Sequence, residues 1–216
     1  MIDSAAPVVG VAGLGDGIAV LRSASVPRGA EAWLALAVRD VLAELGTIDV
    51  VGVAVGPGTF TGVRVGLAMA LGLAMARGVP VAPLSALALR AALLPDRSRV
   101  LALLDARKGR VYAASFDTTG ATPVLLDREV DALPEVAITG AGVAVGEGAA
   151  VYGARVRFAG LDLAEDPGRT PVGAALALVR ATAWVAPERV APVYLREPDH
   201  GPMLAPGRRP EQGRRS

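Results

Sequence analysis

Short runs of apolar and β-branched residues, separated by glycines, open the chain. Residues 8–12 and 18–21 are two such runs, and the glycine-rich residues 13–17 between them predict a hairpin turn. A dinucleotide-binding fingerprint would need a helix directly after its glycines, and a second strand follows here instead. We therefore interpret this segment as a structural β-hairpin.

Helical periodicity begins near residue 31. In residues 31–45 apolar positions recur every three to four residues, which predicts a helix with one buried face. Residues 50–55 are continuously apolar and rich in valine, which is typical of a strand buried on both faces. After the glycine-rich residues 56–62 a second helix is predicted to run to Arg77, with Gly78 as its C-terminal cap.

The second half of the chain carries shorter elements. Residues 80–83 lead into a third helix with Ser85 as its N-cap, and residues 94–99 are the best linker candidate. The other predicted elements are a hairpin of strands 100–104 and 111–116, short strands at 136–139 and 156–159, and a helix at 171–185. Interleaved strands and helices predict an α/β fold with partly parallel sheets.

Composition and charge narrow the possible functions. The 216 residues are 52% hydrophobic, so a wholly disordered chain is excluded. There is no cysteine and one histidine, His200, which excludes disulfide scaffolds, cysteine nucleophiles, cysteine-ligated zinc and His-rich metal sites. The net charge is +1, yet the arginine-rich residues 201–216 alone carry +3. The remaining chain is slightly acidic and is not expected to be a basic nucleic-acid-binding module.

The sequence shows neither a secretory signal nor a membrane span. The first residues include Asp3 and lack the basic stretch of a signal peptide. The longest uncharged apolar run of the first half, residues 65–76, is shorter than the ~20 residues that cross a bilayer. We therefore expect a soluble, cytoplasmic protein that makes no membrane contact.

The glycine-rich loop at residues 56–62 resembles a phosphate-binding turn, since a strand precedes it and a helix follows. Its details do not fit the known signatures. Val63 and Arg64 stand where a P-loop has lysine and serine or threonine, and Thr61 occupies the position of the third Rossmann glycine. A tight turn whose glycines allow close packing is favoured over an anion site.

The helix after this loop is apolar on every side, and such a helix is expected to be buried on every side. Residues 32–38 of the preceding helix, which include Trp33, are also uninterruptedly apolar. A chain of this size can barely cover both helices itself, so we favour a protein–protein interface over internal burial. A stripe of small residues would let another backbone approach closely: Gly58, Gly62, Gly66, Ala70, Ala74 and Gly78.

Two carboxylates stand at strand ends, where α/β enzymes often hold metal-bound phosphates. Asp3 lies at the start of the chain and Asp105 follows the predicted strand 100–104. The sequence alone does not bring the two together, and Asp105 is equally suited to forming a turn.

Several motifs, in order along the chain, resemble the TsaB (YeaZ) family. VGPGTFTGVRVG at residues 55–66 is similar to the family's GPGSFTGLRIG. DARKGRVY at residues 105–112 and PVYLREPD at residues 192–199 match its DARRGEVY and PxYLRxPD. PLSAL at residues 83–87 and MIDSA at residues 1–5 are similar to its SSLEAL and AIDTAT. The set is specific, although no single motif is.

This resemblance implies an actin-like ATPase (ASKHA, ribonuclease H-like) fold, α/β, of two subdomains with mixed sheets flanked by helices. The expected division is an N-terminal subdomain at 1–97 with the partner-binding helices, a smaller C-terminal subdomain at 98–198 whose terminal helix can pack back on the first, and a disordered basic tail at 199–216.

The resemblance also implies a function. The chain would be a non-catalytic dimerisation and activating subunit of the complex that forms N6-threonylcarbamoyladenosine in the anticodon loop of tRNAs. It would bind the transferase TsaD, with the ATPase TsaE in the larger complex, form a homodimer when isolated, and contact tRNA only indirectly. No catalytic residue, metal or cofactor is expected in the chain itself.

The implied interface uses the helices at 31–45 and 61–77. The candidate partner-binding residues are Trp33, Leu34, Ala37, Thr61, Gly62, Arg64, Gly66, Met69, Ala70, Leu73 and Ala74. In the homodimer, Gly62, Gly66, Ala70 and Ala74 would lie at or near the two-fold axis. The candidates for a vestigial phosphate site are Asp3, Gly56, Gly58, Gly140 and Gly142.

The chain departs from the family at two places. The family's HSE before the first long helix reads Gly29-Ala30-Glu31, and only Met1 and Ile2 precede Asp3, so the first strand is expected to be stunted. The paired histidines that bind metal in the catalytic relatives have no counterpart, so this chain is not expected to be the metal-dependent transferase. The alternative is a stand-alone nucleotide-binding enzyme that uses Asp3 with residues 56–62 and 140–142.

Overall fold

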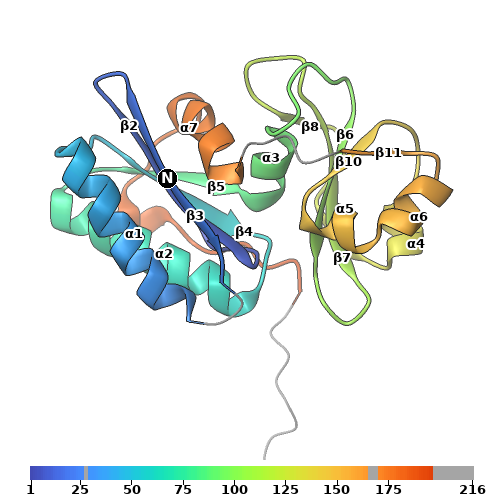
Figure 1. Ribbon diagram of the computed structural model, residues 1–216, viewed down its shortest axis with the longest axis horizontal. Coiled ribbons are helices and arrows are strands. Elements are labelled where there is room, and N and C mark those ends of the chain that lie inside the picture. The colour runs from blue at the N-terminus through green and yellow to red at the C-terminus, as the bar shows by residue number, and fades with distance from the viewer. Residues whose placement is uncertain (27–28, 165–169, 197–216) are drawn as a thin grey trace, which may run out of the picture.

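The computed structural model describes residues 1–26, 29–164 and 170–196, which form two α/β lobes side by side (Figure 1). Lobe 1 is built on a five-stranded sheet of order β3-β2-β1-β4-β5. Its strands are β1 (Ile2–Asp3), β2 (Val8–Gly15), β3 (Ile18–Ser25), β4 (Val51–Gly56) and β5 (Val81–Ser85). Lobe 2 is built on a sheet of order β11-β10-β6-β7-β8, with β9 beside β7. These mixed sheets with flanking helices confirm the predicted α/β class.

The first sheet begins with the predicted hairpin. β2 and β3 pair antiparallel along their whole length, and only Asp16 and Gly17 form the turn, so both strands are longer than predicted. β1 lies between β2, to which it is antiparallel, and β4, to which it is parallel. β1 has two residues, as expected, although each of its neighbours has at least six.

Helices cover both faces of this sheet. α1 (Ala30–Leu45) and α2 (Phe60–Arg77) pack side by side on one face, and α7 (Pro171–Ala181) packs on the other (Figure 1). β4 is fully buried between them, as its sequence predicts. The turn chemistry is also confirmed, because Gly78 adopts a left-handed φ of 65° at the end of α2 and the Ser85 hydroxyl caps α3 (Ala86–Ala91). α3 lies between the two lobes.

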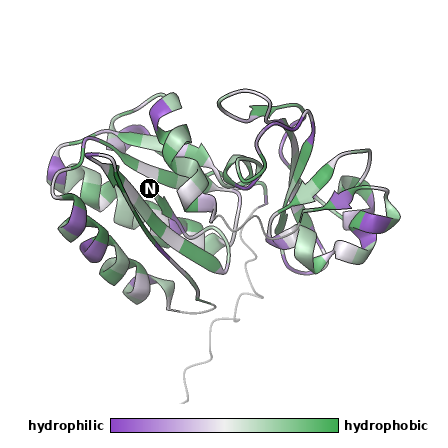
Figure 2. Ribbon diagram, turned by 45° about the horizontal axis from the view of Figure 1, so that its top comes forward, coloured by the Kyte–Doolittle hydropathy of each residue, from purple (hydrophilic) through white to green (hydrophobic). Residues whose placement is uncertain are grey.

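Lobe 2 contains the predicted hairpin and several short elements. Its strands are β6 (Val100–Asp105), β7 (Val111–Asp117), β8 (Val124–Leu125), β9 (Val130–Ala132), β10 (Val143–Val145) and β11 (Asp162–Leu163). Its helices are α4 (Pro134–Ala137), α5 (Glu147–Val151) and α6 (Gly153–Phe158). Hydrophobic residues dominate the strands of both sheets (Figure 2).

Three of the predicted elements are wrong. The expected strand at 136–139 begins inside α4, and most of the one at 156–159 lies in α6, because a segment of four residues suits a helical turn as well as a strand. The parallel strand that does follow is β10. The helix predicted at 171–185 ends at Ala181, and Val185 instead pairs with Val81 at the edge of the first sheet. The predicted disordered tail, at 199–216, lies outside the described residues.

The chain returns to lobe 1 after completing the second sheet. α7 packs against β2, β1 and β5, and the 3₁₀ turn η1 (Pro187–Arg189) contacts α2. The next residues cross the edge of lobe 1, where the Val193 N–H donates to the Val55 carbonyl at 2.7 Å. We call residues 190–196 the C-terminal strap.

Candidate functional site

The first candidate site is the pair of helices α1 and α2. Five of the eleven predicted interface residues are buried within the described structure, so the remaining six are the ones left accessible to a partner. Those that the chain itself buries are Leu34, Ala37, Gly66, Ala70 and Ala74. Part of the stripe of small residues lies against Ser4, which directly follows β1, because a Cβ on Gly62 would be 2.1 Å from the Ser4 carbonyl oxygen and one on Gly66 would be 2.4 Å from the Ser4 hydroxyl. The close backbone approach that it allows is to the end of the chain's own first strand.

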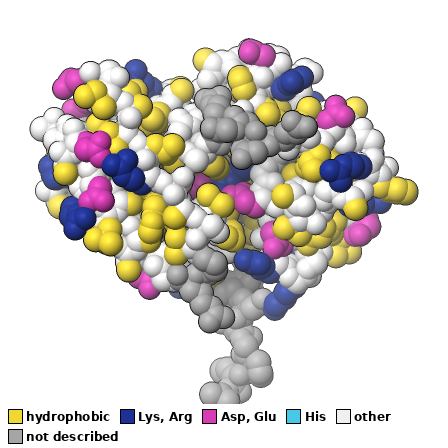
Figure 3. All heavy atoms as spheres, viewed as in Figure 1, with side chains coloured by type: hydrophobic (Ala, Val, Ile, Leu, Met, Phe, Trp, Pro, Cys, Tyr) yellow, Lys and Arg dark blue, Asp and Glu magenta, His cyan; other side chains and the backbone are white. Residues whose placement is uncertain are grey.

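The outward face of the two helices is also apolar. Leu36 on α1 is 53% exposed and Met75 on α2 is 72% exposed. Small or apolar side chains continue this surface, and Figure 3 shows hydrophobic atoms interspersed with charged ones over this part of lobe 1. We call the exposed and half-exposed set the outer helical face: Trp33, Leu36, Thr61, Arg64, Ala68, Met69, Gly72, Leu73 and Met75.

Arg64 marks one end of this face and is held by an aromatic pair. Its guanidinium lies 3.6 Å from the centre of the Phe60 ring, and its Nε donates to the Tyr194 hydroxyl at 3.0 Å. The two rings are themselves in contact, with centroids 5.1 Å apart. Because Tyr194 belongs to the C-terminal strap, these contacts tie the strap to the start of α2.

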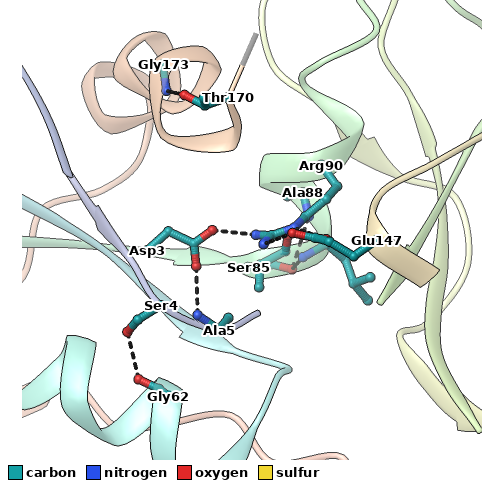
Figure 4. Close-up of polar contacts among 12 residues, drawn as sticks. Asp3, Ser4, Ala5, Gly62, Ser85, Ala88, Arg90, Glu147, Thr170 and Gly173 are labelled. Carbon is teal, nitrogen blue, oxygen red and sulfur yellow. Dashed lines mark hydrogen bonds and ion pairs between the residues drawn. The ribbon is translucent and has the colours of Figure 1, made fainter. Parts of the chain in front are cut away.

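The second candidate site, around Asp3, is filled by the chain's own side chains (Figure 4). The Asp3 carboxylate accepts from Arg90 Nη1 at 2.5 Å and from the Ala5 N–H at 3.0 Å. Arg90 is fully buried on α3, and its guanidinium also donates two hydrogen bonds to the Glu147 carboxylate, from Nη2 at 3.0 Å and from Nε at 3.1 Å. Burial alone would raise the pKa of Glu147, but the charge and hydrogen bonds of Arg90 lower it below its ordinary value.

This arrangement joins three elements from two lobes. Asp3 ends β1 of the first sheet, Arg90 stands on α3 between the lobes, and Glu147 opens α5 of the second. We call these residues the Arg90 triad. The Asp3 carboxylate is therefore paired with a buried guanidinium of the same chain.

The glycines of the 56–62 loop serve packing, which favours the structural interpretation of this loop. A Cβ on Gly56 would lie 2.3 Å from the Val193 carbonyl oxygen, and one on Gly58 would lie 2.4 Å from the Ala5 carbonyl oxygen. The Thr59 hydroxyl caps α2 by accepting from the Gly62 N–H at 3.3 Å. The space that these glycines leave is thus occupied by the strap and by Ala5, which follows β1.

The remaining phosphate-site candidates, Gly140 and Gly142, lie in the segment before β10. Gly140 and Gly142 lie against Arg99, and the glycines that approach Arg90 and the end of β6 are Gly146 and Gly148. The strand expected before Gly140 lies after it, as β10. The sequence pattern therefore placed the glycines at 140–142 after a strand, whereas in the structure they precede one.

Asp105 is held separately from Asp3. Its carboxylate accepts from the Arg107 N–H at 2.9 Å and lies 3.4 Å from that residue's guanidinium. It lines a cavity of about 190 Å³ between the lobes, together with Thr59 and Tyr194. The two carboxylates therefore make separate ion pairs, and the turn role proposed for Asp105 is the one observed.

A further ion cluster, which the sequence pattern did not indicate, anchors the strap to lobe 2. Asp131 accepts from Arg110 Nε at 2.7 Å and from Arg196 Nε at 2.6 Å. Burial alone would raise the pKa of Asp131, but hydrogen bonds from Arg196 and Arg110 lower it. The sequence analysis also did not single out Arg90. The signal for it was a lone arginine in the apolar run ALALRAALL, because an isolated charge among buried positions needs a buried partner.

The comparisons with known proteins agree on one family. The model for TsaD, the tRNA N6-adenosine threonylcarbamoyltransferase, matches residues 28–164, which is more than half of the chain. The tRNA threonylcarbamoyladenosine biosynthesis protein TsaB of Escherichia coli is 31% identical over 214 residues, covering 90% of this chain and 93% of that protein. An uncharacterized protein of Mycobacterium tuberculosis is 32% identical over 172 residues, covering 77% of this chain and 73% of its own.

Solved structures give the same answer. YeaZ from Pseudomonas aeruginosa superposes with a TM-score of 0.76 at 28% identity, over 90% of this chain and 97% of that one. With the actin-like fold, the ordered motifs and a TsaB relative matched over nearly its full length, the chain belongs to the TsaB (YeaZ) family.

Proposed function

We propose that this protein acts in the formation of N6-threonylcarbamoyladenosine in tRNA by binding and activating a TsaD-type transferase through the outer helical face. The observation that supports this most directly is the apolar outward side of α2, which the chain leaves uncovered at Met75 while burying the opposite side at Ala70 and Ala74. An uncovered apolar surface on two adjacent helices is typical of a protein–protein contact.

α2 is, among the described residues, the one helix long and apolar enough by length and composition to cross a membrane. Its packing on β4 and its capped ends suit a water-soluble protein whose apolar helix is covered by a partner. We accordingly place the protein in the cytoplasm, where tRNA modification takes place.

The Arg90 triad supports a scaffolding role over independent catalysis. A nucleotide-dependent enzyme of this fold would need Asp3 available for a metal–phosphate group, and here its carboxylate is already neutralised by a buried guanidinium. Opening that site would break a buried ion pair, which costs about 3–5 kcal/mol. The stand-alone nucleotide-binding enzyme is therefore the weaker proposal.

The interface proposal can be tested by charge insertion. Leu36→Asp and Met75→Asp each place a carboxylate on an exposed apolar position, so the monomer should fold normally. We expect each change to weaken binding to the TsaD-type subunit at least about tenfold, or ~1.4 kcal/mol, in calorimetry. Transferase activity of the mixed subunits should fall in parallel.

Val136→Asp is the matched control, because Val136 is 68% exposed but lies on α4 of lobe 2. It should leave binding unchanged. Wild-type affinity in both lobe 1 variants would contradict the interface, as would an equal loss in the Val136 control. Gly66→Leu or Ala70→Arg would be unsuitable tests, because both residues pack inside the chain.

Other contacts follow from the same surface. The isolated protein should form a homodimer through the outer helical face, with its axis near Ala68 and Gly72 in place of the buried stripe. Adding the transferase should then convert the dimer to a heterodimer, which native mass spectrometry can detect. A TsaE-type ATPase would join that pair, and tRNA would be bound mainly by the partner, because residues 1–200 carry a net charge near −2.

A further inference from the structure

Arg64 stands in line with the apolar residues of the outer helical face. Steps of four, four and three residues along α2 lead from it through Ala68 and Gly72 to Met75, and all of these positions are exposed. Residues at this spacing share one side of a helix. At the usual helical rise Met75 therefore lies about 17 Å from Arg64 along the axis, with a strip of small residues between them.

The guanidinium of Arg64 is held in place without being neutralised. It stacks on the Phe60 ring at 3.6 Å, and its Nε donates to the Tyr194 hydroxyl at 3.0 Å. A guanidinium has five N–H donors, so those on Nη1 and Nη2 remain. Within residues 1–26, 29–164 and 170–196, no carboxylate pairs with Arg64 and no other acceptor takes one of these donors. We call Arg64, Phe60 and Tyr194 the arginine clamp.

The arginine clamp is fixed because the strap that carries Tyr194 is fastened on both sides of it. The Val193 N–H donates to the Val55 carbonyl at 2.7 Å, and Arg196 Nε donates to Asp131 at 2.6 Å. The two rings of the clamp also pack on each other. A guanidinium held in this way loses little conformational freedom when a partner binds, so more of the interaction contributes to affinity.

The charges around the arginine clamp favour an anionic group as its ligand. α2 carries Arg64 and Arg77 and no acidic residue. The two rings of the clamp line the cavity of about 190 Å³ between the lobes, where one acidic residue, Asp105, is outnumbered by basic ones: Arg107, Lys108 and Arg196. A surface of one sign attracts the opposite sign. An opposing copy of α2 would bring two more arginines, so that helix of a second copy does not supply the anion.

The rest of the outer helical face favours a protein over a nucleic acid as the source of that anion. Binding to a phosphate backbone depends on several basic contacts, whereas Arg64 is the single charged member of this face. The exposed side chains of Leu36 and Met75 are apolar. An apolar surface with an arginine at its edge has the composition of a protein–protein interface.

We propose that Arg64 receives the carboxylate of an aspartate or glutamate of the TsaD-type subunit, which accepts two hydrogen bonds from Nη1 and Nη2. This proposal rests on the proposed function and adds the chemistry of the partner surface: an acidic side chain about 17 Å along α2 from the apolar group that covers Met75. Since Tyr194 already holds Nε, the pair of Nη atoms is the edge that the carboxylate meets. Tyr194 acts through Arg64 and is a positioning residue.

Calorimetry with the purified TsaD-type subunit tests the pairing from the side of this chain. Arg64→Gln removes the charge and should weaken binding at least about tenfold. Arg64→Lys keeps the charge without the planar fork, and Tyr194→Phe keeps the ring without the hydroxyl, so each should weaken binding about threefold. Arg77→Gln is the matched control, because Arg77 is exposed on the same helix outside the clamp, and it should change binding less than about twofold. Tm should stay within about 2 °C in all four variants.

Charge exchange tests the pairing from the side of the partner. Arg64→Glu should weaken binding more than Arg64→Gln does, because it places two carboxylates together. Each surface aspartate and glutamate of the TsaD-type subunit is then changed in turn to lysine and measured against Arg64→Glu. One of these changes should restore at least about tenfold of the lost affinity, and the same change should weaken binding to the wild-type chain.

The outcomes separate this pairing from the interface on which it rests. Wild-type affinity in Arg64→Gln, together with a loss in Met75→Asp, would overturn the pairing and leave the interface standing. Wild-type affinity in both variants would remove the interface and the pairing with it. A loss in Arg64→Gln that no charge exchange restores, or one that appears only when the assembled subunits bind tRNA, would assign a different anion to Arg64 and would also overturn the pairing.

Discussion

Replacing Arg90 by methionine should destabilise the protein in a way that depends on pH. Methionine keeps the length and the apolar part of the side chain but removes the charge that holds Asp3 and Glu147. Arg90 is fully buried and the Asp3 side chain is 2% exposed, so water cannot replace the lost partner. Removing one partner of a buried ion pair costs about 3–5 kcal/mol, a large share of a typical total of about 5–15 kcal/mol.

The pH dependence follows from Glu147. In the native protein Arg90 lowers the pKa of Glu147 below its value in the unfolded chain. The stability that the ionised Glu147 contributes is therefore fully present above the unfolded-state pKa and is lost as the pH falls through the lowered native pKa. Without Arg90, burial remains and should raise the pKa of Glu147, so the variant recovers stability as the pH falls. The difference between the two proteins should therefore be largest near pH 8 and smaller near pH 5.

Urea unfolding at pH 5, 6.5 and 8 measures this difference. Arg157→Met is the control, because Arg157 is exposed on α6, and it should change the free energy of unfolding by less than about 0.5 kcal/mol. A third protein that also carries Asp3→Asn and Glu147→Gln should recover part of the loss at pH 8, since no buried charge is left unpaired. A loss below 1 kcal/mol, or one equal at pH 5 and pH 8, would refute the assignment of Arg90 as the counter-ion of these carboxylates.

Three further predictions concern other parts of the chain. Gly62→Ala should lower the free energy of unfolding by more than about 2 kcal/mol, because the new Cβ would clash with the Ser4 carbonyl oxygen. Gly72→Ala on the same helix places its Cβ in open space and should raise the free energy of unfolding by about 0.5–1 kcal/mol, which thermal unfolding of the two variants can measure. For the protein beginning at Met1, the unfolded chain binds more protons between pH 5 and 8, so the free energy of unfolding should rise across that window, and N-terminal acetylation should remove the rise in matched urea titrations. Asp131→Asn should loosen the strap by weakening its bonds to Arg196, which faster proteolysis near the C-terminus would reveal and an unchanged digestion rate would contradict.

The sequence allowed the main elements of lobe 1 to be predicted because their signals are local. The helix at residues 31–45, the buried strand at 50–55 and the cap at Ser85 each depend on periodicity or on a single well-placed residue. Residues 136–139 and 156–159 had no such signal. Segments of only four residues carry too little periodicity to separate a helical turn from a strand, and tertiary packing decides between them.

The orientation of α2 was the part of the site that the sequence could not supply. A helix that is apolar on every side has no preferred face, so the pattern predicted an interface without indicating which residues form it. The small residues suggested a close contact correctly, but the contact is with Ser4 and β1. The isolated Arg90 could have been noticed, but its partners Asp3 and Glu147 could not be identified from the sequence, since the members of the triad are up to 144 positions apart.

The return of α7 to the first sheet has a consequence for how the chain folds during synthesis. Lobe 2 is a continuous stretch that can complete its own sheet, β6 to β11, as soon as residue 164 has left the ribosome. The first sheet is completed only after residue 185 has been synthesised, because α7 covers one of its faces and Val185 pairs with Val81 at its edge. Contacts between residues about 100 positions apart are slow to form, so we expect the lobe made second to reach its native state first, and the apolar face of the first sheet to be the surface that a nascent chain exposes longest.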